Sequence, residues 1–473
     1  MPDSLTIQLV NRTTTQNVFA YITGLAIKNN MARVFLKPDG HSLYYPKSPP
    51  TGVILQPMAE DCAIPLGPPN NTVTVTIPQI AGGRIWFSAD DQLNFLLNPG
   101  GPGGGAALVE PSVLNPSDPN SQVNFTFCEF TLNNDQLFAN ISYVDFVSRL
   151  PVALTLQAQS GAVQHVSGMP FDPLPKISAS LEAQAKKDGW PWDKLIVRKK
   201  GTNEPLRILN PTHANAVGAS FDGYFEPLVE AAWQKYREGG FDQPRQNQPP
   251  PIPPRPEAAP APPPRPPKPR NLLSKLLHRT SSTASNSPPP VPSHSRPPQF
   301  ALPTPVCKTL KINTQAGPGI VTGSVRSSDA PLIISSEKFT KPTTADIFSC
   351  NTGPFVTGPS PLRNAIIPRL AASFQRSTIA HPPRADCESD PSGDCDEHPS
   401  RPETFYKCDI TNHYSRIVHE CNLDGKGYAF AYDDVQIDEG EDQSGKVNAG
   451  DPKVWVVEVG GRDSYVGNKM PVL

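Results

Sequence analysis

The sequence predicts a mainly β protein with a smaller mixed α/β portion and a disordered proline-rich insertion. Three observations predict this fold class: polar and apolar residues alternate in short runs over residues 1–155, the apolar spacing changes to three or four from about Ile177, and prolines crowd into residues 243–299. Alternation with a period of two is typical of strands with one buried face, whereas a spacing of three or four is typical of amphipathic helices.

The N-terminal third contains strand-like runs separated by clusters of Pro, Gly and Asn. These runs are "LTIQLVN", "NTVTVTI", "GRIWFS" and "NFTFCEFTL". Short alternating runs with such separators indicate an antiparallel β-sandwich or barrel.

The remaining folded part mixes helices and strands. We expect helices over "SASLEAQAKKDGW" and "FEPLVEAAWQKYREGG", the second ending at Gly239 and Gly240. After the insertion, structure resumes near Pro305 with strands in "LKINTQ" and "LIISS" and a helix in "LRNAIIPRLAASFQRSTI". We expect the chain to close with strands in "GYAFAYDDV" and "KVWVVEVG".

The insertion, residues 243–299, holds 20 of the 59 prolines, eight Lys or Arg residues and a single acid, Glu257. Such a segment buries too little apolar surface to offset the cost of ordering the chain, so we expect it to be disordered and basic. Its Pro-x-x-Pro stretches with arginines fit the groove of an SH3-like partner, and a plain spacer is the alternative.

Charge and hydropathy exclude several classes of protein. With 42 Lys and Arg against 44 Asp and Glu, the chain has no excess of positive charge for a nucleic-acid or membrane surface. No apolar run approaches the roughly 18 residues of a membrane span. The first residues lack the pattern of a secretory signal, yet eight cysteines and four glycosylation sequons suit an oxidising compartment. We expect an extracellular location, with a cytoplasmic one as the alternative; the sequons begin at Asn11, Asn70, Asn124 and Asn140.

Two acids stand out in the strand-like stretch "CEFTLNNDQLFANISYVDF": Glu129 near its start and Asp145 at its end. Hydrolysis of glycosidic bonds commonly uses two carboxyl groups, and two incidental acids of a β-sheet are the alternative. A tight turn at "NNDQ" would pair Glu129 with Asn140 and leave Asp145 five residues further along its strand, roughly 17 Å away. Glycosidase carboxyls lie roughly 5 to 9.5 Å apart, so we expect a tight hairpin and a catalytic pair to exclude each other. A catalytic pair needs a wide loop over about Asn133 to Ile141, with Glu129 nearly opposite Asp145.

Several stretches together carry a family resemblance. They are "NPSDPNSQVNFTFCEFTLNNDQLFANISYVDF", "FDGYF" with the downstream Trp233, "DIFSCNTGPF", "PRLAASFQRST" and "GKGYAFAYDDV". In this order they resemble glycoside hydrolase family 64, the endo-acting β-1,3-glucanases with a thaumatin-like fold. The resemblance runs over nearly the whole chain except the proline-rich insertion.

The resemblance implies a fold and domain boundaries. We expect a thaumatin-like β-sandwich or barrel domain and a mixed α/β domain on either side of an open groove. The first comprises residues 1–155 and 411–473, the second residues 156–242 and 300–410, with the disordered insertion at 243–299.

The resemblance also implies a reaction: endo-hydrolysis of β-1,3-glucan, such as laminarin, curdlan or cell-wall glucan, to short oligosaccharides with inversion. It places the general acid on Glu129 and the general base on Asp145. We expect partial burial and a nearby anion to keep Glu129 protonated, and Asp145 to stay ionised and activate a water molecule. No metal or cofactor is expected, and the protein should be a monomer.

Four further residues are implied in substrate binding. Thr131 and Asn133 match the positions where the family motif binds glucose hydroxyls. Phe138 and Ser142 stand where family members tend to carry tryptophan and threonine, which leaves sugar stacking and product length open.

Other motifs and functions remain as alternatives. "GGPGGGAALVE", residues 100–110, lacks the Lys-Ser/Thr pair of a P-loop and is expected to be a flexible loop, and His213 has no metal-ligand spacing. A thaumatin-like glucan-binding protein without turnover is the first alternative function. An interaction protein that acts through its proline-rich segment is the second.

Overall fold

The computed structural model describes residues 3–100, 105–237, 310–314, 320–326, 330–380, 397–436 and 442–461. The proline-rich insertion, together with Gly239 and Gly240, lies outside these residues. The described residues belong to one compact unit, residues 1–238 and 299–473. Our division of this unit into a β domain and a mixed α/β domain stays a prediction.

Two large sheets form the β part of this unit. The first has the order β15 (Val163–Val166), β14 (Val152–Ala158), β24 (Pro452–Val459), β1 (Ser4–Asn11), β7 (Thr72–Pro78). The second has the order β23 (Lys446–Ala449), β12 (Leu137–Ile141), β11 (Asn124–Leu132), β8 (Ile80–Ala89), β2 (Val18–Ala26), β3 (Ala32–Leu36), β4 (Leu43–Tyr44), with β6 (Ile64–Pro65) paired to β2. The strands predicted from alternation, β1, β7, β8 and β11, are confirmed.

The two large sheets share a hydrophobic core. Leu5, Ile7 and Leu9 of β1 are buried while the residues between them are more exposed, as the alternating pattern predicts. Phe130 of the second sheet meets Trp455 of the first, with ring centroids 5.4 Å apart. This contact joins the inner faces of the sheets, so the arrangement is a sandwich.

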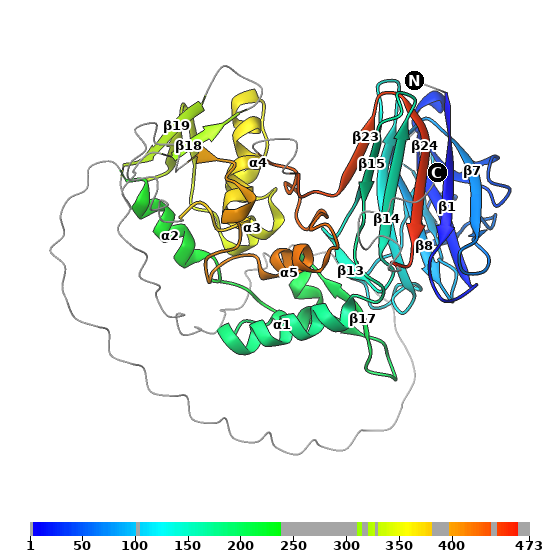
Figure 1. Cartoon of the computed structure of the whole chain (residues 1–473), viewed down its shortest axis with the longest axis horizontal. Helices are drawn as coiled ribbons and strands as arrows, with labels where there is room; N and C mark the ends of the chain where they lie inside the picture. The colour runs from blue at the N-terminus through cyan, green and yellow to red at the C-terminus, as the bar shows by residue number, and fades with distance from the viewer. Residues whose placement is uncertain are drawn as a thin grey trace, which may run out of the picture. The chain divides into compact units, whose positions relative to one another are not determined.

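Strand β24 enters the first sheet between two strands made much earlier in the chain. It pairs in parallel with β1 and antiparallel with β14 (Figure 1). The expected strand in "KVWVVEVG" is therefore confirmed, as a central strand.

Among the residues that the structure describes, three smaller sheets contain the remaining strands. They are β10 (Ala107–Val109), β9 (Leu96–Asn98), β5 (Gln56–Pro57); β13 (Phe146–Ser148), β17 (Pro205–Leu209), β16 (Ile196–Arg198); and β21 (Glu337–Phe339), β20 (Leu332–Ile334), β19 (Ile320–Val325), β18 (Leu310–Asn313), β22 (Glu397–His398). Strands β18 and β20 confirm the predictions for "LKINTQ" and "LIISS".

Several of the helices begin at residues whose side chains satisfy free backbone groups. Thr343 and Asp346 form a capping box at the start of α3, and the Asn412 side chain accepts the backbone N–H of Ser415 at the start of α5. The α-helices are α1 (Leu174–Asp188), α2 (Glu226–Lys235), α3 (Thr344–Ser349), α4 (Pro361–Gln375) and α5 (His413–Cys421). The 3-10 helices are η1 (Ile27–Asn29), η2 (Trp192–Leu195), η3 (Pro211–Val217), η4 (Gly353–Phe355) and η7 (Pro402–Thr404). Helices α1, α2 and α4 confirm the three predicted helices. The predicted end of the second one at Gly239 and Gly240 is wrong, because α2 ends at Lys235 and Arg237 bridges to Val325.

One predicted strand is wrong. In "GYAFAYDDV" only Tyr428 makes a bridge, to Ser142, and residues 429–434 form bends and turns. The reason is local: the backbone N–H of Ala429 donates to the Asp433 carboxylate at 2.9 Å and not to a neighbouring strand.

Five cysteines lie among the described residues, and none of them is in a disulfide: Cys62, Cys128, Cys350, Cys408 and Cys421. Cys128 is fully buried in the sandwich core, on the strand face opposite Glu129. Within the described part of the chain, no helix combines the length and the apolar character needed to span a membrane.

Candidate active site

The hairpin of β11 and β12 carries most of the predicted site residues. Glu129 pairs with Asn140 and Leu132 with Leu137, which is the tight register. The Asn133 carboxamide oxygen accepts the backbone N–H groups of Asp135 and Gln136 at 2.8 and 2.9 Å and so holds the turn. The wide loop that we required for a catalytic pair, with Glu129 nearly opposite Asp145, is wrong.

The distance argument fails because β12 does not continue to Asp145. The strand ends at Ile141, and the chain bends over residues 142–145 before β13 begins at Phe146. The Tyr143 N–H donates to the Tyr428 carbonyl at 2.6 Å, and the Asp145 carbonyl accepts the Asn210 N–H at 2.9 Å. A tight hairpin followed by a bend therefore does not exclude a pair of working carboxylates.

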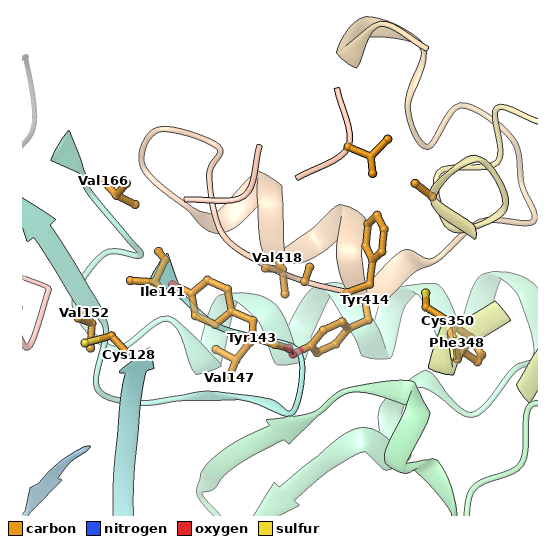
Figure 2. Close-up of a cluster of buried hydrophobic side chains, with 14 of the residues drawn as sticks. Cys128, Ile141, Tyr143, Val147, Val152, Val166, Phe348, Cys350, Tyr414 and Val418 are labelled. Carbon is orange, nitrogen blue, oxygen red and sulfur yellow. Dashed lines mark hydrogen bonds between the residues drawn. The ribbon is translucent and has the colours of Figure 1, made fainter. Parts of the chain in front are cut away.

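Buried side chains of the core hold this bend in place. Tyr143 and Tyr414 lie side by side in the core, and the Tyr414 hydroxyl donates to the Tyr143 carbonyl at 2.7 Å (Figure 2). The bend is thereby fixed by α5, a helix far along the chain.

A single arginine connects the acids of the site. Arg84 of β8 lies opposite Glu129 of β11, and its Nε and Nη2 donate to Glu129 Oε1 at 3.2 and 3.1 Å. Its Nη1 donates to Glu110 Oε2 at 2.6 Å. The guanidinium lies over the rings of Trp86 and Phe127, 5.4 and 4.7 Å from their centroids. We expected an anion as the charge nearest to Glu129, and the structure places this cation there.

Asp145 has a different partner. His213 Nε2 lies 3.1 Å from Asp145 Oδ1, in position to donate a hydrogen bond. This hydrogen bond holds the pKa of Asp145 below its ordinary value against the opposing effect of burial, and the positive charge of Arg84 acts in the same direction. Asp145 and Glu129 thus share the surroundings of one guanidinium, and both remain partly exposed, at 43% and 37% of their side chains.

The predicted substrate-binding residues divide into two groups. Thr131 and Phe138 are paired across the hairpin, so they lie on the same sheet face as Glu129, and both are half-buried. The Thr131 hydroxyl accepts the Gly82 N–H at 3.3 Å. Asn133 lies in the turn, and Ser142 lies in the bend next to Tyr428.

Residue 83 must be glycine for β8 and β11 to approach. A Cβ at Gly83 would lie 2.5 Å from the ring of Phe130, its partner across the strands. This close approach sets Arg84 directly beside Glu129.

Sequence reasoning missed Arg84 and Glu110, and it considered His213 only as a metal ligand and not as a partner of Asp145. Glu110 ends the glycine-rich stretch that we interpreted as a flexible loop, and it directly follows β10. Arg84 occupies an outward position of a predicted strand, where an arginine is usually a solvated side chain. The signal for Arg84 was an isolated charge in an aromatic strand, and the signal for Glu110 was an acid at the end of a glycine-rich stretch. Both become informative only once the strand order is known.

A buried charge cluster lies in the segment after α5. Asp433 is fully buried and accepts hydrogen bonds from Arg376 Nη2 at 3.0 Å and His419 Nε2 at 2.9 Å. Burial opposes both charges, yet the pKa of Asp433 lies below its ordinary value because of His419 and Arg376, and the pKa of His419 lies above its ordinary value because of Asp433. This cluster is structural and does not line the site.

Known proteins resemble the chain over most of its length. The family model of glycoside hydrolase family 64, described as beta-1,3-glucanase, matches residues 3–249 and 306–459. Two relatives named glucan endo-1,3-beta-glucosidase, from Cellulosimicrobium cellulans and Arthrobacter sp. (strain YCWD3), are each 23% identical over 410 residues. The match covers 85% of this chain and 55% of each relative, so the chain spans about half the length of these curated relatives.

Solved structures show the same fold. A laminaripentaose-producing beta-1,3-glucanase in complex with laminaritetraose matches with a TM-score of 0.68 and 22% identity, over 97% of this chain and 99% of that chain. A beta-1,3-glucanase domain from Clostridium beijerinckii matches with a TM-score of 0.61 and 17% identity, over 97% and 98% of the two chains. The mainly β architecture is therefore common to all three.

Proposed function

The chain belongs to glycoside hydrolase family 64, and from this membership we propose that it hydrolyses internal β-1,3-glucosidic bonds of glucans such as laminarin, curdlan or cell-wall glucan. The products are short oligosaccharides, and the anomeric configuration inverts. The name shared by the two curated relatives supports this substrate class.

The observation that carries the proposal is the salt bridge of Arg84 with Glu129 on the outer face of the large sheet, together with the effect of the Arg84 charge on the pKa of Asp145. Each carboxylate is partly exposed and so open to a polymer lying along this face. Thr131 and Phe138 offer a hydroxyl and an aromatic ring on the same face, suited to the polar edge and the apolar face of a glucose ring.

The proposed reaction assigns one role to each acid. Glu129, when protonated, gives its proton to the leaving glycosidic oxygen, and the bond to the anomeric carbon breaks. Asp145 takes a proton from a water molecule, which attacks the opposite face of that carbon. The lowered pKa of Asp145 suits a base that must be ionised. Inversion requires room for this water, which corresponds to about 6.5 to 9.5 Å between the carboxyl groups.

The finer features of the fold belong to the same proposal. A thaumatin-like sandwich and a mixed α/β domain on either side of an open groove would accept the interior of a long glucan. An extracellular location would give the enzyme access to such a polymer.

The test uses the full chain with laminarin and curdlan. We expect release of reducing sugar, with the α-anomer forming first by NMR, because inversion at a β-linkage yields it. Glu129→Gln and Asp145→Asn should each lower the rate of hydrolysis about 10²- to 10⁴-fold. Both variants should still bind laminarin, as measured by affinity electrophoresis.

The control is Glu182→Gln, which removes a surface carboxylate paired with Arg198 at 2.9 Å and should leave the rate unchanged. A wild-type chain that retains laminarin and releases no reducing sugar would favour the non-catalytic binding protein. First formation of the β-anomer would refute inversion.

A further inference from the structure

We infer that Glu110 is a positioning residue: it holds Arg84 and, through Arg84, controls how readily Glu129 keeps its proton. The inference rests on the proposed function for the roles of Glu129 and Asp145. It adds a third carboxylate that touches neither the bond to be broken nor the attacking water.

Glu110 and Glu129 bind different edges of the same guanidinium. Glu110 Oε2 accepts a hydrogen bond from Nη1 at 2.6 Å, whereas Glu129 Oε1 accepts hydrogen bonds from Nε and Nη2 at 3.2 and 3.1 Å. The two carboxylates are therefore held at the same time, and the contact with Glu110 is the shorter one. Charge-assisted hydrogen bonds of this length are the stronger kind.

The position of the guanidinium is fixed by its support. Trp86 and Phe127 lie beneath it, and the Trp86 indole N–H donates to Thr23 at 3.1 Å. The aromatic faces attract the cation without competing for its N–H groups. Glu110 approaches from the separate sheet β10-β9-β5, so its hold on Arg84 is independent of the β8 and β11 ladder.

Arg84 lies among charged groups from several elements. It binds Glu110 after β10 and Glu129 of β11, and its charge also acts on Asp145 of the bend, which is hydrogen-bonded to His213 of η3. Further charged side chains on this sheet face include Arg33 of β3, Arg207 of β17 over the Phe125 ring, and Lys446 of β23, which is paired with Asp442 at 3.1 Å.

This arrangement addresses a difficulty of the proposed mechanism. Arg84 favours the charged form of any carboxylate beside it, but the general acid must carry a proton. Glu110 occupies one edge of the guanidinium and contributes a negative charge, and both effects help Glu129 to keep its proton. Removing the Glu110 carboxylate would free this edge of the guanidinium and leave more of the positive charge of Arg84 uncompensated. Both changes would make Glu129 lose its proton more readily.

The experiment compares pH–activity profiles on laminarin for the full chain. In Glu110→Gln we expect the alkaline limb, where the general acid loses its proton, to move to lower pH, with activity on that limb falling about two- to fivefold. Glu110→Asp should restore part of the profile. Arg84→Gln should move the alkaline limb to higher pH, the opposite direction, which a merely structural defect would not produce.

Two controls make the outcome decisive. Glu182→Gln removes a carboxylate of similar exposure from a similar arginine pair and should leave both limbs unmoved. Carboxyl-labelled glutamate allows the titration of Glu129 to be followed by carbon-13 NMR, with assignment from Glu129→Gln, and this measurement needs no turnover.

Each outcome decides a separate question. If Glu110→Gln lowers the rate at every pH while the limbs and the titration of Glu129 stay in place, the inference is wrong. If the NMR titration moves but the wild type hydrolyses no glucan, the proposed function fails and the coupling of Glu110 to Glu129 stands.

Discussion

Replacing Asp433 by asparagine should destabilise the folded protein strongly. The substitution keeps the shape of the side chain and removes the negative charge that lies between Arg376 and His419, at 3.0 and 2.9 Å. Arg376 is only 2% exposed, so its charge would remain buried without a counter-ion. Removing one partner of a buried pair costs about 3 to 5 kcal/mol in the free energy of unfolding.

The loss in the free energy of unfolding can be measured as a decrease in the melting temperature. At about 2 °C per kcal/mol for a folded unit of this size, Asp433→Asn should melt about 6 to 10 °C lower in differential scanning calorimetry. The matched control is Asp434→Asn, the next residue along the chain, which is half-buried. The Asp434 carboxylate accepts a hydrogen bond from Tyr428, and asparagine can keep this bond, so we expect the control to change the free energy of unfolding by only about 1 kcal/mol or less.

The same variant should also lose activity well below its melting temperature. Asp433 accepts the Ala429 N–H, and Tyr428, one residue earlier, pairs with the bend that carries Asp145. A displacement of about 1 Å at a reacting group can cost up to about 100-fold in rate. Equal melting temperatures for Asp433→Asn and Asp434→Asn would refute the reasoning from buried charge.

Three other predictions concern pH and substrate affinity. His213→Ala removes the hydrogen bond that lowers the pKa of Asp145, so the acid limb of the activity profile should move to higher pH, with about two- to fivefold less activity on that limb; an unmoved limb would contradict the assignment of the base. His419 has a raised pKa in the folded protein, so its contribution to stability is complete below the unfolded value of about 6.5 and is lost as the pH rises through the folded value. The melting temperature of the wild type should therefore fall over this range relative to that of His419→Gln, and parallel curves would show that His419 does not titrate on unfolding. Phe138→Ala should raise KM about fivefold with little change in kcat, corresponding to about 1 kcal/mol of lost stacking; a change in kcat alone would place Phe138 outside the sugar site.

The sequence was sufficient for elements whose pattern is local. Strand β11 and helix α1 follow from apolar residues at spacings of two and of three or four, because burial of one face decides both. The tight hairpin was one of two registers that the same residues allowed, and the choice depended on the Asn133 side chain closing the turn.

The site could be predicted only in part because its geometry depends on distant segments. The bend that brings Asp145 back relies on Tyr428 and Tyr414, more than 250 positions further along the chain. Arg84 gains meaning only once β8 is known to lie beside β11. The turns around Asp433 were misinterpreted as a strand because the aromatic residues of this segment resemble those of a strand. The sequence does not show that Asp433 is buried and that its carboxylate binds the backbone of the same segment.

The position of β24 has a consequence for how the protein is made. Ribosomal synthesis delivers β1 and β14 long before residues 452–459, so each of these strands waits with an unpaired edge that β24 later fills from both sides. Unpaired edges are sites where one chain can join another. The newly made protein is thus exposed to aggregation until residues 452–459 have emerged from the ribosome, and completion of the sheet depends on this one strand.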